Sequence, residues 1–452
     1  MARQNDFWRK LAPLVFPIAF QQLMLSLVSA SDAVMLGLVD QSSLSAASLA
    51  TQIAFVLDVF VFGLTCGGSI LAAQYWGKGS RASVEQVLAI MLRPLLFVGA
   101  VFTAAALFAP ELLMRIYTAD ETLIELGADY LRAVSPSYLL YAVCSSYLCI
   151  MRNSGRTGAA SIVIGVGVVM NIVLNAILIF GLFGAPEMGI RGAAVATTIT
   201  RAFQFACILA EMARKDSLKL RRKDFFGRHL PLTRDYIKYT VTVTYNNLIW
   251  GLGISMGSVI LGHLGNDAVA ANSIASVVKN LVNCFCMGVA NGGAILVGNE
   301  LGAGQLERGK AYGGRVVRLA WISAIATFVL LVSLTPLIVK LATLSSQAES
   351  YLRGMIVVCG INLIGMSNNS AMISGLFCAG GDTKFGAICD TIVLWCIVVP
   401  LGFLAAFVWD WPVLAVYCII CSDEIIKLPA VWHHYLKYKW VKDLTKSEEV
   451  ST

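Results

Sequence analysis

The chain has 452 residues, of which 58% are apolar and only 13% are charged, with a formal net charge of +7. A soluble domain carries roughly 25% charged residues, so this composition excludes an ordinary soluble protein and favours helices that cross a lipid bilayer. Because the basic residues lie between apolar stretches, the positive charge indicates contact with lipid headgroups and no nucleic-acid partner.

Twelve apolar stretches, separated by glycine, proline and charged residues, predict twelve membrane-spanning helices. The first stretch is too long for a signal-peptide core, so we expect it to be retained. In chain order the predicted spans are 11–38, 44–74, 84–109, 123–150, 159–183, 189–213, 235–263, 268–298, 312–339, 348–378, 384–408 and 412–436.

The distribution of basic residues predicts the orientation of these spans. The amino terminus, the even-numbered connections and the carboxyl terminus together hold roughly two dozen Lys and Arg. The odd-numbered connections hold only Arg115, Arg191 and Lys340. Since basic connections stay in the cytoplasm, we expect a multi-pass protein of the inner (cytoplasmic) membrane with both termini in the cytoplasm.

An internal repeat relates the two halves of the chain. Residues 36–79 align without a gap on residues 261–304, at a constant offset of 225, and about 13 of these 44 positions are identical. Small residues let helices pack closely in lipid, so we interpret the matched glycines as packing positions, with a hinge as the alternative. These glycines are Gly63, Gly67 and Gly68 in the first half and Gly288, Gly292 and Gly293 in the second.

Each repeat holds six spans, so both halves enter the membrane from the same side, as in transporters built from parallel repeats. We therefore predict an all-α integral membrane fold of twelve transmembrane helices in two pseudo-symmetric six-helix bundles around a central cleft. The N-lobe would comprise residues 1–222 and the C-lobe residues 223–452.

A charge near the middle of a bilayer costs at least about 2.5–3.5 kcal/mol, so each one requires a reason. Asp32 lies in the first span, after Pro17, which we expect to kink that helix. We interpret Asp32 as a group that holds a proton or a cation. The competing interpretation is an interfacial carboxylate near the outer end of the span.

Asp58, Lys279 and Asp390 are possible secondary charge sites inside the spans. The repeat places Asp58 and Lys279 about one turn apart on related helices, so they either pair or each point into a wet cavity. The last span offers a pair at i,i+4 spacing, interpreted as structural, among Asp423, Glu424 and Lys427.

Several spans carry amide side chains. Asn171 and Asn175 are four residues apart and therefore lie on one face of the fifth span, with Thr197 in the sixth. They either satisfy each other or supply oxygens to a cation. In the second half we expect a polar cavity lined by Tyr245, Asn246, Asn362 and Asn369.

Four motifs follow one another along the chain. They are Pro17 followed by Asp32-Ala-Val-Met-Leu-Gly, the glycine-rich second span ending at Gly77-Lys78-Gly79, Arg152-Asn-Ser-Gly-Arg-Thr157, and Asn171-Ile-Val-Leu-Asn175 followed by Gly192-Ala-Ala-Val-Ala-Thr197. Together they resemble the multidrug and toxic compound extrusion (MATE) family of cation-coupled exporters, over about residues 8–440. The DinF-like bacterial branch is a better match than the NorM-like branch.

The resemblance implies roles for particular residues. Asp32 falls on the cation-coupling aspartate of the N-lobe, and its usual companions fall on Asn171, Asn175 and Thr197. Many relatives carry aspartate at the position of Asn175, so this chain has one acid there unless Asp58 substitutes. The coupling ion, H⁺ or Na⁺, therefore stays open.

The same resemblance implies an antiporter that exports amphipathic, often cationic organic compounds by alternating access. It would work as a monomer, with no cofactor besides the coupling ion. The alternative is a lipid-linked oligosaccharide flippase of the same superfamily. Such relatives typically carry more basic charge in the cavity, whereas here Arg201 and Lys279 are the plausible deep cations.

Enzyme and metal chemistry find no support in the sequence. It contains no H-E-x-x-H, G-x-S-x-G or Walker-type motif, so we expect no catalytic residues. The twelve cysteines lie almost entirely in apolar stretches and are expected to behave as buried hydrophobes, not as metal ligands.

Overall fold

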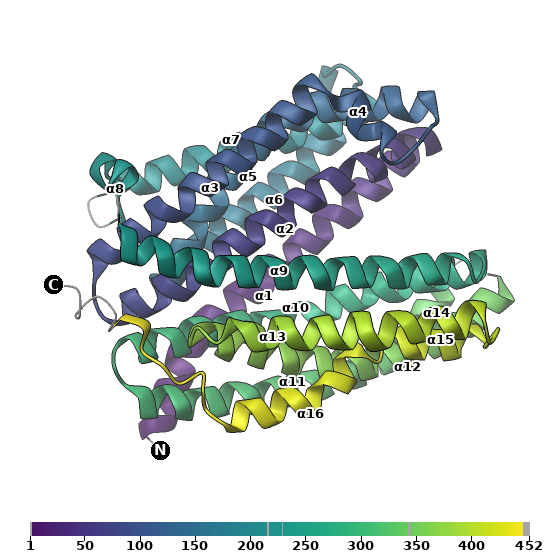
Figure 1. Ribbon diagram of the computed structural model, residues 1–452. Coiled ribbons are helices and arrows are strands. Elements are labelled where there is room, and N and C mark those ends of the chain that lie inside the picture. Colours follow the sequence, from purple (N-terminus) through teal and green to yellow (C-terminus); the bar gives the residue numbers. More distant parts are fainter. Residues whose placement is uncertain (1, 215–216, 228, 342–344, 446–452) are drawn as a thin grey trace. The chain divides into compact units, whose positions relative to one another are not determined.

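The computed structural model describes residues 2–214, 217–227, 229–341 and 345–445, which form helices and short connections without any β-strand (Figure 1). A 3₁₀ turn follows α6 and the short helix α8 precedes the second half. The helices of the first half are α1 (Ala2–Val39), α2 (Gln41–Gly77), α3 (Arg81–Phe108), α4 (Pro110–Arg115), α5 (Glu121–Asn153), α6 (Thr157–Phe180), α7 (Gly189–Ala213) and α8 (Arg222–Phe226).

The second half contains two helices that widen into π-helical turns. Residues Ser370–Phe377 continue α12 in this form, and Thr391–Val398 link α13 to α14. The helices are α9 (Leu230–Gly262), α10 (Asn266–Gly302), α11 (Leu306–Leu341), α12 (Ser346–Asn369), α13 (Thr383–Asp390), α14 (Val399–Phe407), α15 (Val413–Ile420) and α16 (Asp423–Leu436).

Ten helices of the described residues are long and apolar enough to cross a membrane, and they correspond to ten of the twelve predicted spans. The span predicted at 235–263 coincides with α9, one continuous helix. The span predicted at 412–436 is not continuous, because α15 ends at Ile420 and α16 begins at Asp423. The interruption frees the carbonyl of Cys421, which instead accepts a 2.8 Å hydrogen bond from the Asn362 side chain.

The contacts between Cα atoms divide the chain into two compact units. The N-unit comprises Leu23–Trp76 and Ser80–Thr244, and the C-unit comprises Met1–Gln22, Gly77–Gly79 and Tyr245–Thr452. The lobe boundary at residues 222/223 was inferred from the sequence repeat and stays a prediction.

Besides α2, whose last residue Gly77 belongs to the C-unit, two long helices contribute residues to both units. Helix α1 passes from the C-unit to the N-unit after Gln22, and α9 passes from the N-unit to the C-unit after Thr244. At the repeat offset of 225, Gln22 corresponds to Asn247, only three residues from the change in α9. The first long helix of each repeat therefore changes unit at nearly the same level. Helix α1 continues through Pro17 without interruption, and the kink expected there stays a prediction.

Within the N-unit, glycines of α2 admit the neighbouring helix α9. A side chain at Gly63 would overlap Thr244, and one at Gly67 would overlap Thr240, including its Cα atom at 2.9 Å. A side chain at Gly68 would overlap Met91 of α3. The packing interpretation of these glycines is therefore confirmed.

Within the C-unit, α10 admits α1 in the same way. A Cβ atom at Gly288 would lie 2.8 Å from Ala19 Cβ, and one at Gly292 would lie 3.0 Å from a methyl group of Val15. Ala19 and Val15 are the repeat equivalents of Thr244 and Thr240. The repeat therefore conserves two interhelical contacts, residue for residue.

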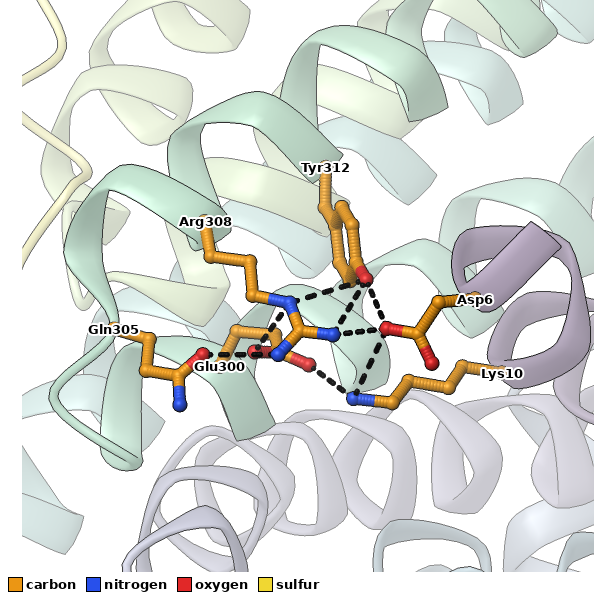
Figure 2. A network of polar contacts seen from close by, with 6 residues as sticks. All are labelled: Asp6, Lys10, Glu300, Gln305, Arg308 and Tyr312. Atoms are coloured by element: carbon orange, nitrogen blue, oxygen red, sulfur yellow. Dashed lines mark hydrogen bonds and ion pairs between the residues drawn. The ribbon is translucent and has the colours of Figure 1, made fainter. Parts of the chain in front are cut away.

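A charged network joins the amino-terminal end of α1 to α10 and α11 inside the C-unit (Figure 2). Lys10 Nζ lies 2.8 Å from Glu300 Oε1, and Arg308 Nε lies 3.5 Å from Glu300 Oε2. Asp6 pairs with Arg308 and accepts a 2.9 Å hydrogen bond from the Tyr312 hydroxyl. Two acids and two bases balance, so the network holds this end of α1 without excess charge.

Candidate functional site

The N-unit brings together all four residues that the resemblance singled out. Asp32 comes from α1, Asn171 and Asn175 from α6, and Thr197 from α7. The Asn175 amide donates to Asp32 Oδ1 over 2.5 Å and to Asn171 Oδ1 over 3.3 Å. The Asn171 amide donates to Thr197 Oγ1 over 3.5 Å, and that hydroxyl donates to the Ala193 carbonyl over 3.1 Å. The result is one hydrogen-bonded chain from a carboxylate to a backbone carbonyl.

Every donor in this chain has a fixed direction. Asn175 is fully buried and uses its amide nitrogen for both Asp32 and Asn171. Its Oδ1 atom is also buried and accepts no hydrogen bond from the described residues. The arrangement suits an ionised Asp32, which only accepts. A proton on Asp32 would add a donor, and the unused oxygen of Asn175 is available to accept it if the amide turns over.

The local sequence explains how these side chains are held. Asn171 and Asn175 lie one turn apart on α6 and point the same way. Next to them, a buried apolar cluster includes Leu36 of α1, Ile179 of α6 and Ala193 of α7. This cluster fixes the three helices beside the polar chain, while Asp32 itself is only half-buried. A half-buried carboxylate can exchange a proton or a cation with water.

The second N-unit acid has its own partners. The Asp58 carboxylate accepts a hydrogen bond from Tyr141 and lies near the Arg201 guanidinium. Arg201 also lies 4.6 Å from the Tyr141 ring centre and donates to Gln204 over 2.9 Å. Asp58 is therefore compensated by a cation of its own unit. Sequence reasoning missed Tyr141, because nothing in the spacing distinguishes this tyrosine from others in the spans.

In the C-unit, Lys279 Nζ donates to Asn362 Oδ1 over 2.7 Å. The predicted cavity residues divide into two groups. Asn362 and Asn369 are buried and bond to charged side chains, and Asn246 bonds to the Asp390 carboxylate. Tyr245 is exposed, and its hydroxyl lies 3.4 Å from the Thr391 hydroxyl.

The predicted i,i+4 ion pair in the last span is wrong. Lys427 Nζ instead lies 2.9 Å from Glu424 Oε1, at i,i+3 spacing, and 2.7 Å from Asp390 Oδ1 on another helix. The Asp423 carboxylate instead accepts a hydrogen bond from Asn362, while Lys427 pairs with the two other acids. In the sequence, the presence of three ionisable residues within five positions of an apolar span was the feature that could have indicated a larger charge cluster.

The described residues contain no group of three or more His, Cys, Asp or Glu side chains that could hold a metal ion. The sites described above contain carboxylates, lysine and arginine side chains, amides and hydroxyls. Such groups exchange protons, bind monovalent cations and form hydrogen bonds with organic molecules.

Comparisons with known proteins agree with this picture. The MatE family model matches residues 17–177 and 246–404. The chain is 22% identical over 432 residues to the uncharacterized transporter YisQ of Bacillus subtilis, covering 95% of this chain and 94% of that one. It is 24% identical over 446 residues to a probable multidrug resistance protein NorM of Thermotoga maritima, covering 98% and 95%.

A solved structure of a MATE family transporter of the MOP superfamily, in an outward-facing conformation, matches with a TM-score of 0.86 at 18% identity. The match covers 95% of this chain and 96% of that chain. It confirms the predicted fold class, an all-α membrane fold of twelve helices in two lobes. The DinF-like branch stays a prediction. Since the family model covers more than half of the chain, this protein belongs to the MATE family of multidrug efflux transporters and is a multi-pass membrane transporter, not an enzyme.

Proposed function

We propose that this transporter is an antiporter that exports amphipathic, often cationic organic compounds in exchange for inward-moving H⁺ or Na⁺. The observation that carries the proposal is the hydrogen-bonded chain from Asp32 through Asn175 and Asn171 to Thr197. A half-buried carboxylate at one end of such a chain can convert the binding of one ion into a change in helix contacts.

The proposed switch follows from the donor directions. When Asp32 takes up a proton it becomes a donor, so the Asn175 amide turns its oxygen toward Asp32 and Asn171. The Asn171 amide then turns as well and accepts from the Thr197 hydroxyl. Thr197 thereby gives up its hydrogen bond to the Ala193 carbonyl, which loosens one turn of α7 and favours release of substrate. A bound Na⁺ would reorient the same amide oxygens toward Asp32.

The setting of the proposed cycle comes from the charge pattern. Basic connections indicate the cytoplasmic membrane with both termini in the cytoplasm, and relatives named as multidrug resistance proteins suggest small organic substrates. We expect one chain to form the functional transporter, since each chain carries both repeats. Alternating access would require the two repeats to rearrange during each cycle.

Reconstitution in proteoliposomes tests the proposal. Uptake of a fluorescent organic cation is followed with a pH gradient and a Na⁺ gradient imposed separately, for the wild type and Asp32→Asn. The matched control is Asp129→Asn, an exposed acid beside Arg132. We expect gradient-driven transport in the wild type and the control and its loss in Asp32→Asn, with the effective gradient identifying the ion. Gradient-driven transport that survives in Asp32→Asn would refute the coupling role.

We do not favour the lipid flippase. Its cavity would need free cations for a pyrophosphate, whereas Arg201 lies beside Asp58 and Gln204, and Lys279 donates to Asn362 and interacts with the charge of Asp423. If the wild-type protein moved no organic cation under either gradient, that result would favour the lipid flippase.

A further inference from the structure

The C-unit holds a cluster of five charged residues drawn from three helices, of which four are buried and one, Lys279, is half-buried. Lys427 of α16 lies between two acids, 2.7 Å from Asp390 Oδ1 and 2.9 Å from Glu424 Oε1. The exposed fractions of the three side chains are 3%, 6% and 7%. The cluster is completed by Asp423 of α16 and Lys279 of α10.

Asp423 differs from the other two acids because it has an amide in place of an ion pair. Asn362 donates to Asp423 Oδ1 over 3.3 Å and accepts from Lys279 Nζ over 2.7 Å. Within the described part of the chain, no Lys, Arg or His nitrogen lies within 4.0 Å of the Asp423 carboxylate. The amide of Asn362 thus separates this acid from the nearest cation.

Other ionisable groups nearby do not alter the charge. Cys421 and the pair formed by Cys359 and the Tyr417 hydroxyl, 3.0 Å apart, lie beside the cluster and are neutral in apolar surroundings. The cluster therefore contains three carboxyl groups and two ammonium groups. With all five ionised it would carry one uncompensated negative charge in a buried site, which is unfavourable.

The cluster is also short of hydrogen-bond donors. Asn369 is 2% exposed and uses its amide nitrogen for the Glu424 carboxylate over 2.9 Å, while its buried Oδ1 accepts no hydrogen bond from the described residues. Asn246, which donates to Asp390, likewise has a buried Oδ1 without a donor. One added proton would balance the charge of the cluster.

From this geometry we propose that the C-unit cluster is a second proton-binding site, with Asp423 as the residue that binds the proton. With a proton on Asp423, two carboxylates balance two ammonium groups: Lys427 stays paired with Asp390 and Glu424, and Lys279 stays hydrogen-bonded to the neutral Asn362. The backbone fits a functional site as well. A π-helical segment begins directly after Asn369 and another directly after Asp390, and such segments occur frequently at functional sites.

Only one consequence of this inference rests on the proposed function, namely that a second proton takes part in each transport cycle. The binding itself can be measured without transport. The full-length protein in lipid nanodiscs is titrated between about pH 5 and about pH 9, and the infrared carbonyl band of protonated buried carboxyl groups is recorded. The variants are Asp423→Asn, Asp32→Asn and the double variant, with Glu349→Gln as an exposed, surface-paired control.

We expect Asp423→Asn to lose about half of the titrating band and Asp32→Asn to lose the other half, with the control unchanged. A second variant, Lys279→Met, retains Asp423 but removes the nearby cation, so the Asp423 component should persist to higher pH. An unchanged band in Asp423→Asn would overturn the inference while leaving the role of Asp32 intact. Loss of the Asp423 component on adding Na⁺ at constant pH would assign the site to Na⁺ and also overturn it.

Discussion

Replacing Lys427 by methionine tests the charge balance of the C-unit cluster. Methionine retains most of the length of the side chain but leaves Asp390 and Glu424 without their shared cation. Because the three side chains are 3–7% exposed, water screens the remaining repulsion poorly. Removing one partner of a buried ion pair costs about 3–5 kcal/mol. We expect a loss of stability within this range, because one lysine pairs with two acids.

For a unit of this size, such a loss lowers the unfolding temperature by on the order of 6–20 °C. The assay heats the purified protein and measures the monodisperse fraction that remains. Lys340→Met, at an exposed position near the end of α11, is the matched control. Asp390→Asn in the Lys427→Met background should recover part of the loss, since it removes one unpaired charge. Unchanged stability in Lys427→Met, or no recovery in the double variant, would refute the reasoning.

Three further predictions concern other parts of the structure. Thr197→Val removes the hydroxyl at the end of the Asp32 chain and should slow gradient-driven transport in proteoliposomes about 2–10-fold, the value of one hydrogen bond. Equal rates in the variant and the wild type would contradict the proposed switch. Gly67→Ala overpacks against Thr240 and should cost about 1–3 kcal/mol. Thermal unfolding should show partial recovery in Gly67→Ala/Thr240→Ala, and no recovery would mean that the contact is not the cause. Glu300→Gln removes the acid that Lys10 and Arg308 share. Because both basic side chains are more than a third exposed, the loss should be about 1 kcal/mol or less for each pair and should shrink in about 1 M salt. A loss that is independent of salt would argue against an ion pair.

The features predicted best from the sequence are those with short-range or periodic signals. Apolar length located the helices, and the repeat identified glycines whose packing partners also obey the offset of 225. Asn171 and Asn175 could be placed on one face because four residues make about one turn. Their contact with Asp32, 143 residues away in the chain, came from the resemblance and not from spacing.

The C-unit cluster could not be predicted for the same reason. Lys427 and Asp390 are 37 residues apart and Lys279 and Asn362 are 83 apart, so no local pattern joins them. From the sequence, an acid within the last span already provided a partner for Lys427, so no partner on another helix was expected. The break between α15 and α16 was also hidden, because Cys421 and Ser422 lack the glycine or proline that usually marks one.

Helices α1 and α9 each pass from one unit to the other, and this has a consequence for biosynthesis. Val15 and Ala19 are made early, but the glycines of α10 that receive them emerge about 270 residues later, roughly 14–55 s at a translation rate of about 5–20 residues per second. During that interval the amino-terminal half of α1 lies in the membrane without its final partner. By contrast, α9 finds α2 already inserted as soon as it is made. The contact between α2 and α9 can therefore form before the equivalent contact between α10 and α1. The N-unit can be completed before α10 of the C-unit has been made.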